Sequence, residues 1–208
     1  MKSIWALRMV VVGLFLGCVV GLSSVGHAAG TGSATEAIKG TIDRVLKVLQ
    51  QKELQSDNKK TERLTRLIEV IGQRFDYEEM GKRTISREWE SLNSQQQKEF
   101  VALFQRFLTT SYASNVDSYS GEKVEYLKER KKGNFAEVQT KVISPKSRVP
   151  IDYRLLKKNQ EWRVYDVIID GVSLMKNYRG QFTRILKTSS FDGLLAKLRT
   201  KADQASHP

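Results

Sequence analysis

The stretch Trp162–Phe182, WRVYDVIIDGVSLMKNYRGQF, predicts a strand, a tight turn and the start of a helix. Trp162–Ile169 is rich in aromatic and β-branched side chains, which favour a strand, and Asp170-Gly171 is typical of a turn. The Ser173 hydroxyl can accept hydrogen bonds from the free amides of a helix start. The apolar residues after it recur at helical spacing: Leu174, Met175, Tyr178 and Phe182. A helix is therefore expected to begin near Leu174.

The chain upstream predicts helices. Ala34–Leu54 and Lys59–Phe75 both carry apolar residues every three or four positions, which is typical of amphipathic helices. Asp76 is expected to cap a third, short helix, with Glu79 completing a capping box. A longer helix is expected from Asn93 or Ser94. Its apolar stripe is Phe100, Leu103, Phe104, Phe107, Leu108 and Tyr112.

After Gly121 the apolar period changes from helical spacing to two, which predicts strands with one solvated face. The connections are short and polar, so the strands should form an antiparallel meander of about four, ending with Trp162–Ile169. A last helix is expected at Asp192–Lys201. The predicted fold class is α+β, with N-terminal and C-terminal helices packed on a curved antiparallel sheet.

Residues 1–29 are typical of a secretory signal, with Lys2 and Arg8, an apolar run over Met9–Leu22 and small residues up to Ala29. Cleavage after Ala28 or Ala29 would leave residues 30–208 as one domain. An uncleaved anchor and a lipid on Cys18 are the alternatives.

Cleavage changes the composition of the chain. The net charge falls from +12 to +10, because Lys2 and Arg8 are lost, and the only cysteine is lost with them. A mature chain without cysteine suits a bacterial periplasm better than a disulfide-stapled secreted scaffold.

Catalytic chemistry is poorly represented in residues 30–208. His207 is the only histidine there, which argues against histidine triads and zinc sites, and thiol catalysis has no cysteine. Asp166 and Asp170 are the best carboxylate pair, but four strand residues put them about 13 Å apart, beyond the separation that glycosidases use. We expect Asp166 to bond an arginine or a backbone amide and Asp170 to shape the turn. No enzymatic activity is expected.

The basic run Lys128–Lys132 is expected on a hairpin loop. Nucleic acid is not an expected partner, because no aromatic side chains are interleaved with these lysines for base stacking. Attraction toward phosphate headgroups or an acidic partner protein remains open.

Three segments carry a resemblance to a known family. FDYEEMGKR at Phe75–Arg83, FxxxFxxFLxxSYAS at Phe100–Ser114 and the Trp162–Phe182 stretch are similar to the MlaC family, the periplasmic phospholipid-binding component of the Mla lipid-asymmetry system. The resemblance covers essentially all of residues 30–208.

The resemblance implies a monomeric carrier that takes a glycerophospholipid between an outer-membrane lipoprotein complex and an inner-membrane ABC-transporter complex. It implies an apolar cavity for the acyl chains, with phospholipid as cargo and no cofactor or metal. A lipid-free adaptor module with a filled core is the alternative function. A binder of small polar solutes is a third, for which no cluster of polar side chains is visible.

The lipid-binding residues expected from the resemblance belong to the strand-to-helix unit, a neighbouring strand and the long helix. They are Tyr153, Trp162, Val164, Val172, Leu174, Met175, Tyr178 and Phe182, with Phe104, Leu108 and Tyr112. Each could instead be ordinary core. Val172 and Met175 should face the enclosed space, and Arg179 should hold the helix to the sheet through Asp166 or else approach a headgroup.

Overall fold

The computed structural model describes residues 32–113, 121–145 and 147–206. The expected signal segment, with Cys18, lies outside the described residues, and so does His207. The elements in chain order are α1 (Ala34–Leu49), the 3-10 turns η2 (Lys52–Leu54) and η3 (Asp57–Lys59), α2 (Lys60–Gly72), α3 (Tyr77–Ile85), α4 (Arg87–Ser91), α5 (Ser94–Ala113), β1 (Lys123–Lys132), β2 (Phe135–Ile143), β3 (Arg148–Lys158), β4 (Glu161–Ile169), β5 (Val172–Ser173), α6 (Leu174–Thr188) and α7 (Phe191–Ser206).

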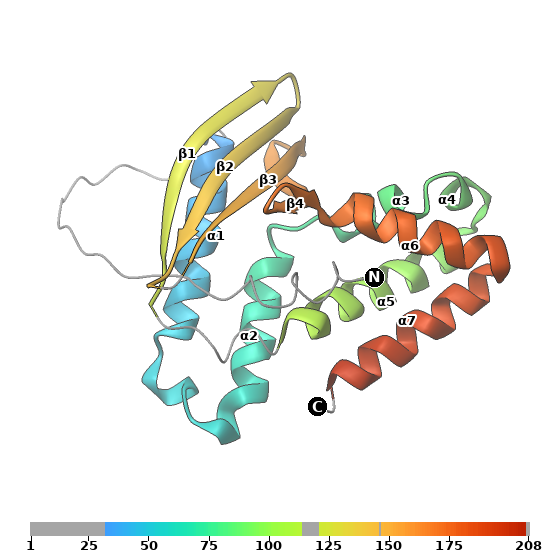
Figure 1. Cartoon of the computed structure of the whole chain (residues 1–208), viewed down its shortest axis with the longest axis horizontal. Coiled ribbons are helices and arrows are strands. Elements are labelled where there is room, and N and C mark those ends of the chain that lie inside the picture. Colours follow the sequence, from blue (N-terminus) through green and yellow to red (C-terminus); the bar gives the residue numbers. More distant parts are fainter. Residues whose placement is uncertain (1–31, 114–120, 146, 207–208) are drawn as a thin grey trace.

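The strands form one antiparallel sheet in the order β1-β2-β3-β4-β5, with helices packed on it. Figure 1 shows a curved sheet over α1 on one side of the molecule, and α3, α5, α6 and α7 gathered on the other side. α1 packs on β1 and β2, whereas α3 and α6 pack on β4. The predicted α+β class is confirmed. The sheet has one strand more than expected, because the two residues of β5 pair with β4.

A tight turn connects β4 to β5 at the end of the meander. Asp170 and Gly171 both have positive φ, 49° and 77°, between the paired residues Ile169 and Val172. Two residues of positive φ between paired strands are the mark of a type I′ turn, whose twist matches that of the strands. The predicted turn is therefore confirmed.

The expected helix starts are also present. Ser173 accepts a hydrogen bond from the Lys176 amide at 3.1 Å, and Asp76 accepts one from the Glu79 amide at 3.0 Å. The capping box at Asp76 is only half formed, because the Glu79 carboxylate bonds to Arg83 instead, at 2.7 Å.

Several element boundaries differ from the prediction. The first helix ends at Leu49 rather than Leu54, and the last one runs over Phe191–Ser206, beyond Asp192–Lys201. α4 was not expected. The basic run Lys128–Lys132 lies in β1 and not in a loop. Because β1 is an edge strand, its charged side chains oppose pairing with a strand of another molecule.

A β-bulge in β4 determines which side chains of this strand face the core. Arg154 pairs with Asp166, and the next residue of β3, Leu155, pairs with Val164, so Tyr165 is the extra residue. The bulge shifts the alternation by one position. The β4 side chains in the main core are therefore Trp162 and Val164 before the bulge, and Val167 and Ile169 after it.

The same bulge leaves Asp166 out of this apolar set, with 4% of its surface exposed. Its carboxylate accepts hydrogen bonds from the Ser173 hydroxyl at 2.7 Å and the Met175 amide at 3.1 Å, and it pairs with Arg154 at 3.4 Å. A buried carboxylate needs such partners, because removing a charge from water costs several kcal/mol. Asp166 thus joins β3, β4, β5 and the first turn of α6.

Replacing Asp166 with alanine should lower the free energy of unfolding by about 3 kcal/mol, because it leaves the Met175 amide and the Ser173 hydroxyl without their acceptor. Asp170→Asn is the matched control, since asparagine also tolerates the positive φ of the turn, and it should stay within about 0.5 kcal/mol of wild type. Urea unfolding of both variants makes the comparison. Equal stabilities would contradict the role assigned to Asp166.

Candidate functional site

The apolar interior between the sheet and the helices is the candidate site. Eight of the eleven predicted site residues are buried in one continuous core cluster, contributed by α5, β4 and α6. They are Phe104, Leu108, Trp162, Val164, Leu174, Met175, Tyr178 and Phe182. That they line a cavity for acyl chains stays a prediction.

The helix half of this interior is aromatic. Phe104 on α5 meets Tyr178 and Phe182 on α6, with ring centroids 6.1 and 6.0 Å apart, and both contacts are edge-to-face. Phe100 and Phe107, on the same helix as Phe104, extend the cluster toward Phe182 and Tyr178. These two residues were part of the predicted stripe but not of the predicted site, because spacing alone does not reveal which rings meet.

The sheet half is built around Trp162. Its indole N–H donates to the Gly32 carbonyl at 3.1 Å, just before α1, and the Lys131 ammonium lies 5.6 Å from its ring. Glu129, on β1, accepts from the Thr35 amide at 2.8 Å and so holds the first turn of α1. These polar contacts lie at the N-terminus of α1. Val164, two residues after Trp162 on β4, is fully buried.

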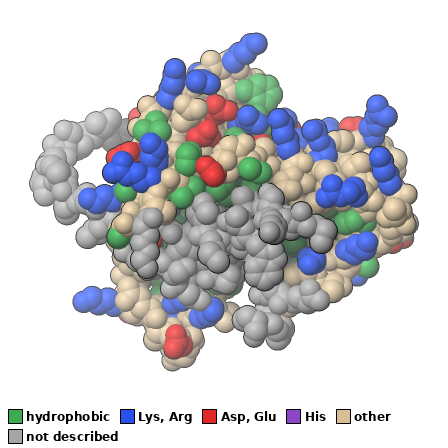
Figure 2. All heavy atoms as spheres, viewed as in Figure 1, with side chains coloured by type: hydrophobic (Ala, Val, Ile, Leu, Met, Phe, Trp, Pro, Cys, Tyr) green, Lys and Arg blue, Asp and Glu red, His purple; other side chains and the backbone are tan. Residues whose placement is uncertain are grey.

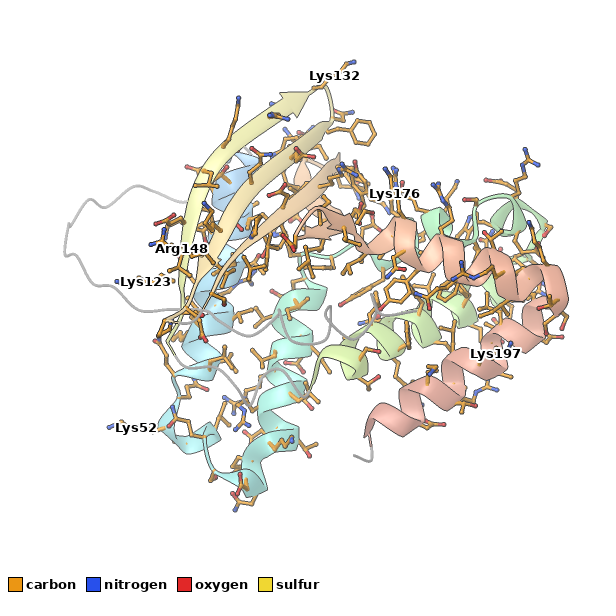
Figure 3. The ribbon with its side chains drawn as sticks, in the orientation of Figure 1. Lys52, Lys123, Lys132, Arg148, Lys176 and Lys197 are labelled. Carbon is orange, nitrogen blue, oxygen red and sulfur yellow. The ribbon has the colours of Figure 1, made fainter. Side chains whose placement is uncertain are left out.

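The first turn of α6 lies where the two halves meet (Figure 3). Leu174 and Met175 are 6% and 3% exposed, so Met175 faces the interior as predicted. The same prediction for Val172 is wrong, because Val172 is 44% exposed on the edge strand β5. The side chain of Tyr112 lies outside the described residues.

Two tyrosines come from the sheet. Tyr153 on β3 is partly buried against the core, and burial raises the pKa of its hydroxyl to about 12, with a smaller contribution from Asp152. Burial likewise raises the pKa of the Tyr126 hydroxyl, with smaller contributions from Tyr153 and Asp43. The Tyr126 hydroxyl is buried and makes no hydrogen bond to the described residues. Tyr126 lies in the region after Gly121 that was predicted only as strands, since no pattern in the sequence marks an unpaired hydroxyl.

Asp166 and Asp170 have different structural surroundings. Asp166 is held by Arg154 and the Met175 amide, which confirms its predicted structural role. The expected pairing of Asp166 with Arg179 is wrong, since Arg179 is exposed and Arg154 takes that place. Asp170 lies in the turn.

The described residues offer little support for a metal site or a polar ligand pocket. No three or more His, Cys, Asp or Glu side chains there gather as metal ligands do. A pocket of about 270 Å³ lies between η2 and α2. Three of its four charged lining residues pair with each other, Glu62 with Lys59 at 2.8 Å and with Arg66 at 2.6 Å, which leaves little to hold a ligand. None of the described helices has the length and apolar character that crossing a bilayer requires.

A family model described as "MlaC protein" matches residues 39–200 of the chain. The chain belongs to the MlaC family. The match includes all the strands and every predicted site residue.

Two relatives illustrate the family. The intermembrane phospholipid transport system binding protein MlaC of Haemophilus influenzae is 26% identical over 130 residues, which are 60% of this chain and 61% of that protein. This chain therefore matches less than two thirds of the length of that relative. A solved structure of a phospholipid-binding protein from Ralstonia solanacearum, in complex with a phospholipid, has a TM-score of 0.73 and 23% identity. The match covers 84% of this chain and 99% of that one, and it shows the shared fold.

Proposed function

We propose that this member of the MlaC family is a periplasmic carrier that holds a glycerophospholipid by its acyl chains. The observation that carries the proposal is the family match over residues 39–200. The Haemophilus influenzae relative is a binding protein of a phospholipid transport system, and the Ralstonia solanacearum protein of the same fold was solved with a phospholipid. The signal-like residues 1–29 support a periplasmic location.

The chemistry of the interior supports an acyl-chain cargo. The eight buried site residues carry no formal charge, and the Tyr153 hydroxyl, whose pKa burial raises to about 12, is also neutral at physiological pH. Each methylene buried from water contributes about 0.8 kcal/mol, so about fifteen of them contribute on the order of 12 kcal/mol before ordering costs.

Tyr126 offers a polar contact to such a cargo. A buried hydroxyl without a hydrogen-bond partner costs about 1 to 3 kcal/mol. An ester oxygen of the lipid would accept its hydrogen and remove that cost. We place the ester end of the cargo near Tyr126 and Tyr153, and the acyl chains toward Met175 and Phe104.

Tight binding of the lipid means that its release needs a partner. A carrier that holds its cargo by many methylenes releases it slowly, so a partner must open the interior or offer a competing pocket. We therefore propose that the chain exchanges lipid with an outer-membrane lipoprotein complex and an inner-membrane ABC-transporter complex of the Mla system. We propose a monomer as the carrying form.

The competing function is a lipid-free adaptor, in which the same interior is a filled core. The protein purified from cells without added lipid should yield phospholipid at close to one molecule per chain when extracted with organic solvent and analysed by mass spectrometry. An unrelated exported protein, purified in parallel, measures the background. An extract at background level from folded protein would favour the adaptor.

A substitution inside the interior separates the two functions at residue level. Met175→Trp should lower the bound phospholipid by about half or more, because the indole occupies the space of the acyl chains, while the delipidated protein stays folded. Val172→Trp is the matched control, since Val172 is exposed, and it should keep its lipid. Lipid content and thermal melts of delipidated protein give the two readouts, since bound lipid raises the melting temperature by mass action.

A filled core predicts another pattern for these variants. There Met175→Trp overpacks the interior and lowers the free energy of unfolding by about 1 to 3 kcal/mol. A variant that melts far below wild type and yet keeps its full complement of lipid would defeat the assignment of Met175 to the cargo site.

A further inference from the structure

Helix α6 has an exposed face that the proposed function does not use. Its fifteen residues, Leu174–Thr188, include four cations and no aspartate or glutamate. All four cations are exposed: Lys176, Arg179, Arg184 and Lys187. None of them makes an ion pair with any residue that the structure describes.

Some cations on the helices around α6 do have acidic partners. Arg83 on α3 pairs with Glu79 at 2.6 Å, Arg106 on α5 pairs with Asp203 at 2.6 Å, and Arg199 on α7 pairs with Glu99. Figure 2 shows basic side chains spread over this helical half of the molecule, with few acidic ones among them. The field outside α6 is therefore positive and is not cancelled locally.

Three of the four cations lie on the same side of the helix. At 100° and 1.5 Å per residue, Lys176, Arg184 and Lys187 lie within about 80° around the axis and span about 16 Å along it. We call these three residues the α6 ridge. The opposite face of the helix is buried through Tyr178 and Phe182, so the ridge is fixed in position and directed outward.

We infer that the α6 ridge docks the protein on the anionic surface of a phospholipid membrane. The ridge offers charge without an apolar anchor, since the large apolar side chains exposed in the described residues are Leu127, Phe135 and Val172, none of them on α6. Protein interfaces concentrate aromatic side chains at their centre and are poor in lysine. A membrane of acidic headgroups attracts a row of cations without requiring an apolar contact.

Docking through the ridge sets the orientation of the protein on the membrane. α6 carries Met175 and Phe182 on its buried face and the ridge on its outer face. A protein docked in this way lies with its proposed cargo helix against the headgroups. The docking itself depends on charge alone, so it can be tested apart from the cargo.

Sedimentation of the mature chain with vesicles tests the inference. The wild type should bind vesicles of phosphatidylglycerol and phosphatidylcholine, bind pure phosphatidylcholine vesicles weakly, and lose binding as salt is raised. A variant with Lys176→Gln, Arg184→Gln and Lys187→Gln should bind the anionic vesicles about 100-fold more weakly, which is about fivefold for each cation. Glutamine is a good helix former, so α6 should persist, and circular dichroism checks it.

A second triple variant controls for net charge. Lys52→Gln, Lys123→Gln and Arg148→Gln removes the same charge from exposed cations at the opposite end of the molecule from Lys176 and Lys197 (Figure 3). This variant should bind nearly as well as wild type. Equal losses in the two triple variants, or equal binding of wild type to both kinds of vesicle, would overturn the inference.

Two further readouts complete the test. No binding of wild type to anionic vesicles at low salt would also overturn the inference, and would point to an acidic protein as the partner. The phospholipid content of the ridge variant, measured on the same preparation, should equal that of wild type. A failure of docking is thereby distinguished from a failure of the proposed carrier function.

Discussion

The buried carboxylate of Asp166 is the interaction on which the arrangement of sheet and helices depends. It is 4% exposed and binds three groups from two parts of the chain: Arg154 on β3, and the Ser173 hydroxyl and the Met175 amide at the start of α6. The charge is tolerable in the interior only while these groups stay together. The direction in which α6 leaves the sheet is thus fixed by an electrostatic requirement, supported by the type I′ turn before it.

The bulge at Tyr165 makes this arrangement compatible with an apolar interior. Without the extra residue, strict alternation would place Asp166 on the same face as Trp162 and Val164. With it, the carboxylate joins Arg154 and Glu137, which are 3.2 Å apart, and the core face stays apolar along the strand. Polar contacts that hold the fold are thereby kept apart from the side chains proposed to hold acyl chains.

Local chemistry made much of this fold predictable. The turn at Asp170-Gly171 and the cap at Ser173 depend on residues within a few positions, so the sequence indicates them directly. The exposure of Val172 and the pairing of Arg154 with Asp166 could not be read in this way, because both depend on which segments are neighbours in space. Most of the predicted site is buried, since apolar helical spacing marks the inward face, but burial alone does not separate a cargo site from a core.

The central claim is that an acyl chain lies inside, against the first turn of α6. Nuclear Overhauser contacts between methyl groups of the protein and the acyl chains of bound phospholipid test it most directly. The protein would carry ¹³C-labelled methionine and valine methyls, purified with its natural cargo. The account predicts contacts from the methyls of Met175 and Val164 to acyl methylenes, and none from Val172. Contacts from Val172 alone, or none from any buried methyl in lipid-loaded protein, would contradict it.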